Sequence, residues 1–483
     1  MTSVECDAVS EDFLSLIPRD FAREHLIVSQ GRTNGTERLA VADSTNPAAV
    51  FNTGVRMGVD VEPVIADAEA IARTLDDAYA NITASSDHDQ ADAGEAFDGV
   101  ELERLLAEAD RDLLSTQGKG KIIKLVDILL FEALSRRASD VHIQPLEDRA
   151  LVRYRLDGVL HTVRELPRPV TAAVVSRVKV MGRMDIAERR VPQDGRATVT
   201  IGDRAIDLRI STLPTNYGER VVIRLLDNTR QLCNFDQLGM PPEVADRFLE
   251  RSRRTNGIIL VTGPTGSGKT TTLYSTLRRT GSSEVNIMTI EDPIEYDLSS
   301  IGLAISQAQV NNRKGITFAS GLRHILRQDP DVIMVGEIRD AETARVAIQA
   351  SLTGHLVFST LHTNDAVSAV TRLVDLGVEA YLVSASLSAV LAQRLMRLIH
   401  EPCEGRGCDE CLGTGFRGRT GVFELMVVDD NLRELIAKEA GLSSLREAAA
   451  ANGLRTLREA GKRLVAAGRT TRAEAERMVE GSS

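Results

Sequence analysis

One octapeptide, Gly-Pro-Thr-Gly-Ser-Gly-Lys-Thr at residues 263–270, constrains the fold of this chain more than any other feature. It fits the phosphate-loop pattern, in which backbone amides and the N-terminus of a helix bind polyphosphate. The apolar run at residues 257–262 supplies the strand that such a loop follows, and residues 271–278 have a helical pattern. The octapeptide therefore predicts an α/β domain that binds ATP and Mg²⁺.

The loop residues have distinct expected roles. Lys269 should reach the outer phosphates, and Thr270 should help to hold Mg²⁺. The expected nucleotide contacts are Gly263, Pro264, Thr265, Gly266, Ser267, Gly268, Lys269, Thr270 and Thr271.

Four apolar runs between residues 238 and 398 indicate a parallel sheet. They lie at residues 257–262, 285–290, 331–338 and 355–361, with helical stretches between them. Continuous apolar strands that alternate with helices are typical of a parallel sheet covered on both faces. We expect the P-loop ATPase core to span residues 231–398.

Acidic side chains end two of these runs, at the edge where an open parallel sheet places its ligand. Glu291 and Asp292 follow one run, and Glu337 ends the strand expected at residues 332–335 of another, while Gly336 stands where a P-loop ATPase commonly has an aspartate. Magnesium is then expected to depend on Thr270, water and Glu337. This leaves Glu291 to orient or deprotonate the attacking water. The alternative is that these acids are solvated strand ends.

Length and charge restrict the class of protein. A chain of 483 residues predicts about three or four domains. No apolar run approaches the roughly 20 residues of a membrane-spanning helix. The N-terminus lacks the pattern of a signal peptide, so a cytoplasmic location is expected. A net charge of −11 argues against nucleic acid as the main partner.

The region before the core divides into three predicted segments. Residues 1–82 alternate helix-like and strand-like patterns, as in a small α/β domain. Residues 83–117 form an expected acidic linker, since 83–98 carry five acidic residues and no Lys or Arg. Residues 118–230, a helix followed by strands, form an expected middle domain. The period of two puts Arg153 with Arg155 on one face of a strand.

Three of the five cysteines crowd between Cys403 and Cys411. In a reducing compartment this spacing suggests a metal before a disulfide. Residues 399–426 are therefore expected to form a Cys-rich module, and residues 427–483 have a helical pattern.

Several motifs together resemble the type II secretion ATPases, the general secretion pathway protein E group. Residues 326–340, LRQDPDVIMVGEIRD, look like the signature of secretion and pilus ATPases, including its Gly before Glu. Residues 289–296 look like the family's aspartate box, and residues 353–365 look like its histidine box. Upstream, residues 138–143, 155–160 and 208–224 also match the family's pattern.

The resemblance implies roles that spacing alone does not. It implies a RecA-like ATPase domain after a PAS-like α/β middle domain, and a homohexamer. His355 and His362 become expected nucleotide-sensing residues, although a lone His is more often structural. Arg209 and Arg224 are the expected arginines that the middle domain supplies to nucleotide, with strand-edge ion pairs as the alternative. The N-terminal domain resembles a docking domain for a membrane-anchored partner.

The cysteine region departs from the family, whose members carry two Cys-x-x-Cys knuckles separated by a substantial insert. Here His400 falls where the first Cys would be, and Cys403, Cys408 and Cys411 follow at short spacing. One His and three thiolates satisfy tetrahedral zinc. The alternative is a degenerate, metal-free loop.

The expected function is that of a cytoplasmic ATPase, docked on the inner-membrane face, that powers pseudopilus extension for protein export. A type IV pilus assembly ATPase is the nearest alternative. A DNA-translocating or DNA-uptake motor is less favoured, because the chain is acidic and has no Trp. A nucleotide-binding scaffold is disfavoured by Lys269, Thr270, Glu291 and Glu337.

Overall fold

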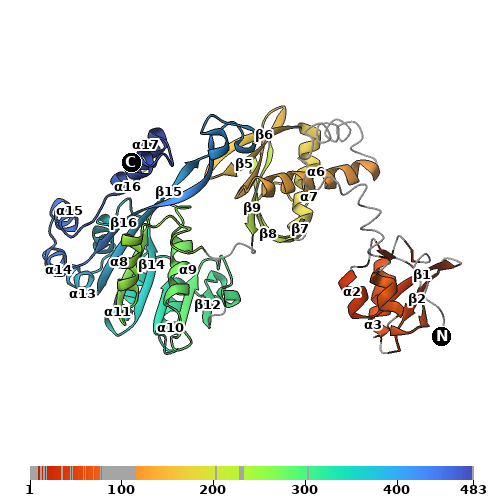
Figure 1. Cartoon of the computed structure of the whole chain (residues 1–483), viewed down its shortest axis with the longest axis horizontal. Coiled ribbons are helices and arrows are strands. Elements are labelled where there is room, and N and C mark those ends of the chain that lie inside the picture. Colours follow the sequence, from red (N-terminus) through yellow and green to blue (C-terminus); the bar gives the residue numbers. More distant parts are fainter. Residues whose placement is uncertain are drawn as a thin grey trace. The chain divides into compact units, whose positions relative to one another are not determined.

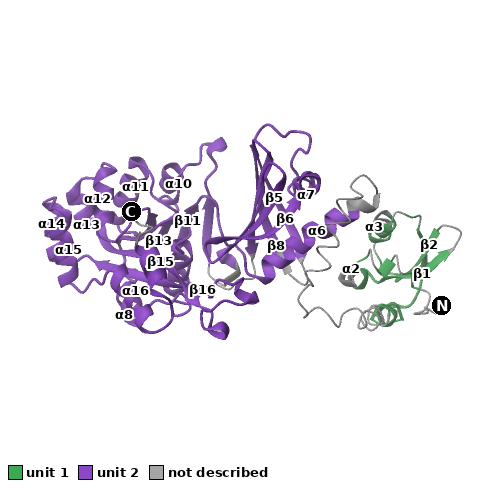
Figure 2. Ribbon diagram, turned by 90° about the horizontal axis from the view of Figure 1, so that it is seen from above, with its two compact units in different colours: residues 1–103 green, residues 104–483 purple. Residues whose placement is uncertain are grey.

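The computed structural model divides the chain into two compact units, residues 1–103 and residues 104–483 (Figure 2). It describes residues 9–78 except 11–12, 15–16, 18, 34–35, 44, 46, 58, 60, 69 and 77, and residues 116–201, 204–227, 233–301 and 304–480. The predicted linker lies outside the described residues, apart from residues 116 and 117, which begin a helix.

The first unit contains a small three-stranded sheet in the order β1-β2-β3. Strands β1 and β2 are antiparallel, whereas β2 and β3 are parallel. Phe13, Leu39 and Ile71 lie fully buried in its core. The elements are α2 (Arg19–Glu24), β1 (Ile27–Thr33), β2 (Thr36–Val41), α3 (Pro47–Met57) and β3 (Val61–Ile65). This is a small α/β fold.

The second unit begins with a six-stranded antiparallel sheet in the order β6-β5-β4-β9-β8-β7, which we call the middle domain (Figure 1). Helices α6 and α7 pack on each other and on the sheet. The α6 positions Ile122, Leu125, Ile128 and Leu129 are all buried. The elements are α6 (Thr116–Ser135), β4 (Asp140–Pro145), β5 (Arg149–Leu156), β6 (Val159–Pro167), α7 (Arg168–Met181), β7 (Gln193–Ile201), β8 (Arg204–Thr215) and β9 (Gly218–Asp227).

The rest of the unit is built on a seven-stranded sheet in the order β12-β11-β13-β14-β10-β15-β16. All neighbouring pairs are parallel except β15 and β16. Along β10, Ile258 and Leu260 join one apolar cluster, while Ile259 and Val261 join the cluster on the other face. The expected parallel sheet, buried on both faces, is confirmed.

The core elements have these bounds: α8 (Pro242–Ser252), β10 (Gly257–Thr262), α9 (Lys269–Thr280), β11 (Ile287–Glu291), η2 (Leu298–Ile301), β12 (Ile305–Gln309), η3 (Asn312–Lys314), α10 (Phe318–Ile325), β13 (Val332–Val335), α11 (Ala341–Leu352), β14 (Leu356–Leu361), α12 (Ser368–Asp375), α13 (Ala380–Ser386) and β15 (Leu387–Ile399). None of the described helices is long and apolar enough to span a bilayer.

Strand β16 (Phe416–Val427) falls largely within the range expected to form a Cys-rich module, yet it is the seventh strand of the core sheet. It pairs with β15 from residue 389 to residue 399, so the short turns η4 (Glu401–Cys403) and η5 (Asp409–Cys411) lie at the tip of a long ribbon. Four helices follow: α14 (Asp430–Ala437), α15 (Leu442–Ala451), α16 (Leu457–Ala466) and α17 (Arg472–Glu480).

Candidate functional site

The phosphate loop connects β10 to α9, and its shape depends on glycine. Gly263, Gly266 and Gly268 have φ values of 149°, 77° and 87°. A Cβ atom at Gly263 would lie 2.4 Å from the carbonyl oxygen of Gln393, and one at Gly268 would lie 2.8 Å from Gln393 Nε2. Glycine therefore supplies both the left-handed backbone and the close approach to β15.

Lys269, the first residue of α9, folds back on the loop. Its Nζ donates hydrogen bonds to the carbonyl oxygens of Gly263 (2.8 Å) and Pro264 (3.0 Å). Burial lowers the pKa of Lys269 to about 8; Arg394 lowers it further, whereas Glu337 opposes the shift. These carbonyl contacts are weak substitutes for an anion, so the site favours a ligand that carries negative charge.

The other loop residues differ in their exposure. Pro264, Thr265 and Gly266 are exposed, whereas Thr270 and Thr271 are half-buried on the first turn of α9. Ser267 is buried, and its Oγ has no hydrogen-bond partner among the described residues.

Glu337 and His362 lie beside Lys269, at the carboxyl ends of the neighbouring strands β13 and β14. Glu337 Oε2 is 2.6 Å from Arg339 Nε and 3.4 Å from His362 Nε2. Burial and then Lys269 lower the pKa of His362, while Glu337 acts in the opposite direction. The structure thus brings Lys269, Glu337 and His362 together.

Glu291 has a different environment. It ends β11, is 3% exposed, and accepts hydrogen bonds from Thr289 Oγ1 (2.6 Å), Gln307 Nε2 (3.0 Å) and the hydroxyl of Tyr274. Burial, followed by the charge of Glu291, raises the pKa of Tyr274. Because these internal bonds occupy the carboxylate, the geometry favours Glu337 for contact with nucleotide. The water-orienting role expected for Glu291 stays a prediction.

The structure gives a physical reason for Gly336. A Cβ atom there would lie 3.3 Å from both Ile290 O and the ring of Phe318, and 3.4 Å from the Cα of Glu291. Strands β11 and β13 therefore approach each other too closely at this point for an aspartate to fit without displacing its neighbours.

His355 does not join this group. It precedes β14, at the opposite sheet edge from His362, and its Nδ1 is 3.0 Å from Ala350 O at the end of α11. The two middle-domain arginines face each other across β8 and β9. Arg209 reaches the aspartate box, donating to Ile294 O (3.1 Å) and lying 3.6 Å from Glu295 Oε2.

Arg224 instead pairs with Asp140 of the middle domain, through an Nε to Oδ1 contact of 3.1 Å. The guanidinium of Arg155 lies 3.6 Å from the second carboxylate oxygen of Asp140. Among the residues that the structure describes, Arg209 is the predicted arginine that contacts the ATPase core.

Two functional candidates were missed by the sequence analysis. Gln393 and Arg394 are buried in β15 beside the phosphate loop, and Gln393 Oε1 accepts a hydrogen bond from Thr272 of α9 (2.7 Å). The signal was present: a Gln-Arg pair interrupts an otherwise apolar strand, and such a buried polar pair requires partners.

His400, Cys403, Cys408 and Cys411 form a compact cluster, with one ligand atom from each lying within 4.8 Å of the others. His400 Nδ1 is 3.4 Å from the Sγ atoms of both Cys403 and Cys408. The other ring nitrogen, Nε2, lies 3.3 Å from Glu410, as second-sphere carboxylates do in metal sites. This donor set fits a tetrahedral zinc ion.

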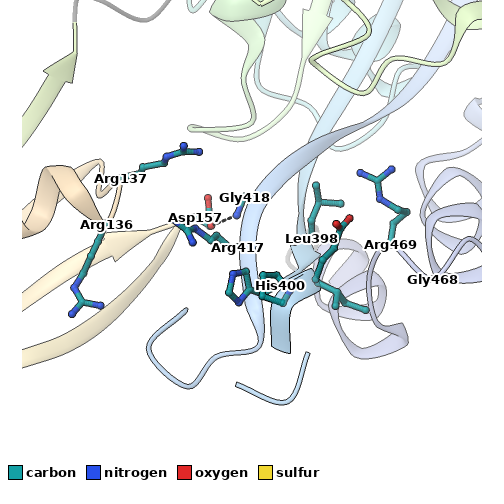
Figure 3. Close-up of a pocket in the computed structure, with 12 residues that line it drawn as sticks. Arg136, Arg137, Asp157, Leu398, His400, Arg417, Gly418, Gly468 and Arg469 are labelled. Carbon is teal, nitrogen blue, oxygen red and sulfur yellow. Dashed lines mark hydrogen bonds between the residues drawn. The ribbon is translucent and has the colours of Figure 1, made fainter. Parts of the chain in front are cut away.

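A cavity of about 370 Å³ adjoins this cluster (Figure 3). Its basic lining residues come from the turn after α6, from β16 and from the turn before α17: Arg136, Arg137, Arg417 and Arg469. Asp157, in the turn between β5 and β6, accepts a hydrogen bond from Gly418 N (2.7 Å) and pairs with Arg419 (3.3 Å). The ribbon tip therefore contacts the middle domain.

Comparison with known proteins adds independent information. Residues 115–477 match the family model described as "Type II/IV secretion system protein", and residues 4–85 match the MshEN domain. The chain is 51% identical over 363 residues to the type II secretion system ATPase E of Vibrio cholerae, covering 70% of this chain and 71% of that protein.

A second relative is the type IV pilus assembly ATPase PilB of Myxococcus xanthus, at 38% identity over 492 residues, 96% of this chain and 86% of that protein. Among solved structures, the Legionella pneumophila ATPase DotB aligns with a TM-score of 0.59 at 23% identity, covering 73% of this chain and 94% of that one. That likeness supports the RecA-like fold of the core.

Proposed function

Because this chain belongs to the family of type II/IV secretion system proteins, we propose that it is the motor that powers pseudopilus assembly and protein export in a type II secretion system. The chain is an ATP-hydrolysing enzyme of the secretion ATPase class. The observation that supports its use of ATP most directly is Lys269, whose buried ammonium group donates hydrogen bonds to loop carbonyls beside Glu337 and His362.

We propose a hydrolysis site in which Lys269 leaves the carbonyls of Gly263 and Pro264 and binds the outer phosphates. Thr270 and Glu337 would hold Mg²⁺, which would neutralise charge on the transferring phosphoryl group. His362 would sense the state of the nucleotide and transmit it to Glu337 through their contact, in which His362 Nε2 lies 3.4 Å from Glu337 Oε2. Glu291 would orient the attacking water, and His355 would sense the nucleotide. Both roles come from the sequence, and no contact described above supports them.

The assembly is also a proposal. We propose a homohexamer in which Arg209 and Arg224 contribute to bound nucleotide. The N-terminal domain would dock on an inner-membrane secretion partner, so the cytoplasmic chain would be peripheral to that membrane. The small sheet of the first unit and the family match to residues 4–85 support a separate docking domain.

We propose Zn²⁺ as the occupant of the His400, Cys403, Cys408 and Cys411 cluster, supported by its donor set and compactness. Zinc would fix the tip of the β15–β16 ribbon.

A type IV pilus assembly motor is the second candidate, supported by the similarity to PilB over nearly the whole chain. The higher identity to the type II ATPase ranks secretion first.

The test combines turnover with phenotype. The purified chain should hydrolyse ATP in a Mg²⁺-dependent manner, and Lys269→Ala should lower that rate by about a hundredfold. Lys462→Ala, an exposed lysine on α16, is the matched control. In the source bacterium, Lys269→Ala should stop export of the secreted protein and leave surface pili intact. Loss of pili with normal export would favour the pilus motor instead.

A further inference from the structure

The segment that follows His362, residues 363–366, is held from two sides, and we call it the post-histidine loop. On one side it is hydrogen-bonded to the end of β10. Thr363 N donates to Thr262 Oγ1 (2.8 Å), and the two threonine hydroxyls are also 2.8 Å apart. Thr262 immediately precedes Gly263, so the loop is tied to the start of the phosphate loop.

Arg394 strengthens this side. The residue is 5% exposed, and its NH2 group donates to Asn364 O (2.9 Å) and lies 3.4 Å from Asn364 Oδ1. Its NH1 group donates to Gln393 O (3.1 Å) and lies 3.1 Å from the position of a Cβ atom at Gly263. The two arms of one guanidinium therefore lie against the phosphate loop and the post-histidine loop.

On the other side, Glu424 ties the post-histidine loop to the C-terminal helices. Glu424 is 4% exposed; its Oε1 accepts Ala366 N (2.8 Å) and its Oε2 accepts Leu457 N (3.0 Å) at the start of α16. Asp365 adds an ion pair with Arg446 of α15 (2.9 Å). Buried carboxylate contacts of this kind hold their partners firmly.

We infer that Arg394 is a positioning residue for ATP hydrolysis and that, through the post-histidine loop and Glu424, it couples the phosphate loop to α15 and α16. The loop follows directly on His362, and His362 contacts Glu337, so the position of the loop sets the geometry at Glu337. This inference rests on the proposed function, because the reaction being positioned is ATP hydrolysis.

The alternative is that Arg394 only fills the core. The two roles predict different effects of replacing Arg394 with lysine. Lysine keeps the positive charge but lacks the planar two-armed group, which donates to Asn364 with one arm and lies against Gly263 of the phosphate loop with the other. A positioning role therefore predicts that Arg394→Lys lowers kcat, whereas a purely electrostatic or space-filling role predicts near-normal turnover.

The kinetic test uses the full chain with saturating Mg²⁺. Arg394→Lys should lower kcat by about tenfold with less than about a twofold change in KM for ATP. Arg372→Lys, an exposed arginine on α12, is the matched control and should behave as the unmodified chain. Unchanged kcat in Arg394→Lys, at the same unfolding temperature, overturns the inference. Absence of turnover in the unmodified chain would instead contradict the proposed function.

A second measurement stays informative if Arg394→Lys folds poorly. In the unmodified chain, ADP should slow hydrogen exchange at residues 263–270 and also at residues 454–460. In Glu424→Gln, protection of the phosphate loop should remain while protection at residues 454–460 is lost. The inference is overturned if Glu424→Gln keeps the C-terminal protection, or if the unmodified chain never shows it although ADP protects the phosphate loop.

Discussion

At the scale of single residues, two glutamates that look equivalent in the sequence occupy different environments. Glu337 lies with Lys269 and His362, whereas Glu291 is enclosed by Tyr274, Thr289 and Gln307. A buried carboxylate that accepts internal hydrogen bonds stabilises the fold. Glu337 is paired with Arg339 and His362 and lies beside Lys269, where it can act on a ligand of the phosphate loop.

Glutamine substitutions should separate these roles. Glu337→Gln should lower turnover by about a hundredfold with little change in stability, since a ligand-facing charge is lost. Glu291→Gln should lower the free energy of unfolding by about 1–3 kcal/mol, because its amide group cannot accept all of the internal bonds. Single-turnover hydrolysis and urea unfolding measure the two effects. If Glu291→Gln abolished turnover at unchanged stability, Glu291 would hold the role predicted from the sequence.

Local patterns were enough to predict the residues that lie at strand ends. Lys269, Glu337 and His362 follow apolar runs, and parallel strands bring such ends to one edge. The neighbours Gln393 and Arg394 come from β15, which begins more than a hundred residues after the end of β10. Only the order of the strands in the sheet places β15 beside β10. His355 illustrates the converse, since it precedes its strand and therefore lies at the end of β14 away from the site, although the family resemblance gave it the same expected role as His362.

At the scale of elements, strand β10 was predicted at its observed bounds, and β11, β13 and β14 were predicted within a few residues, whereas β12 was not predicted. Strand β15 was not predicted because Leu387–Ile399 is a long apolar run, for which helix and strand cannot be distinguished by period. Strand β16 begins just after the cysteine cluster, so the expected module boundary obscured its continuation into the sheet.

The docking of α17 on β15 should depend on pH. Arg397 of β15 and Arg477 both pair with Glu474, at 2.7 Å and 2.6 Å. Burial alone would raise the pKa of Glu474, but these hydrogen bonds outweigh it and lower the pKa to about 2. A depressed carboxyl pKa stabilises the fold above the unfolded value of 4.5, and this stability is lost as pH falls toward 2.

Glu474→Gln should therefore lower the free energy of unfolding by about 2 kcal/mol at pH 7, and by less than about half as much at pH 3. Glu476→Gln, whose pair with Arg472 is exposed, is the control and should have little effect at either pH. Denaturant unfolding followed by circular dichroism measures the difference. An equal loss at both pH values would contradict this account.

At the scale of the whole molecule, the ribbon tip links the metal cluster to the middle domain. Arg136, which directly follows α6, donates to Asp409 O (3.3 Å), between Cys408 and Cys411. Asp157 holds Gly418 and Arg419 of β16. An ion that fixes the four ligands should therefore also stabilise the contact between the tip and the middle domain.

Metal analysis of the purified chain should find about one zinc ion per chain. Cys411→Ser should lose it and speed hydrogen exchange both at residues 400–415 and at residues 136 and 157–158, because the tip loosens from its support. Cys233→Ser, a cysteine outside the cluster, should keep the metal. Zinc binding would be contradicted if the unmodified chain were purified without any metal and if Cys411→Ser left its hydrogen exchange unchanged.

The contact that Arg209 makes with the ATPase core has a thermodynamic consequence. It joins the middle domain to Ile294 and Glu295, just after Glu291. Suppose that the release of nucleotide shifts that segment and weakens the Arg209 contact. Breaking the contact must then lower the affinity for nucleotide by the same factor, because the two changes belong to one thermodynamic cycle. A difference of about 1.4 kcal/mol amounts to about tenfold in affinity. Mechanical load that pulls the middle domain away would then speed ADP exchange, so a motor under tension would reload sooner than an idle one.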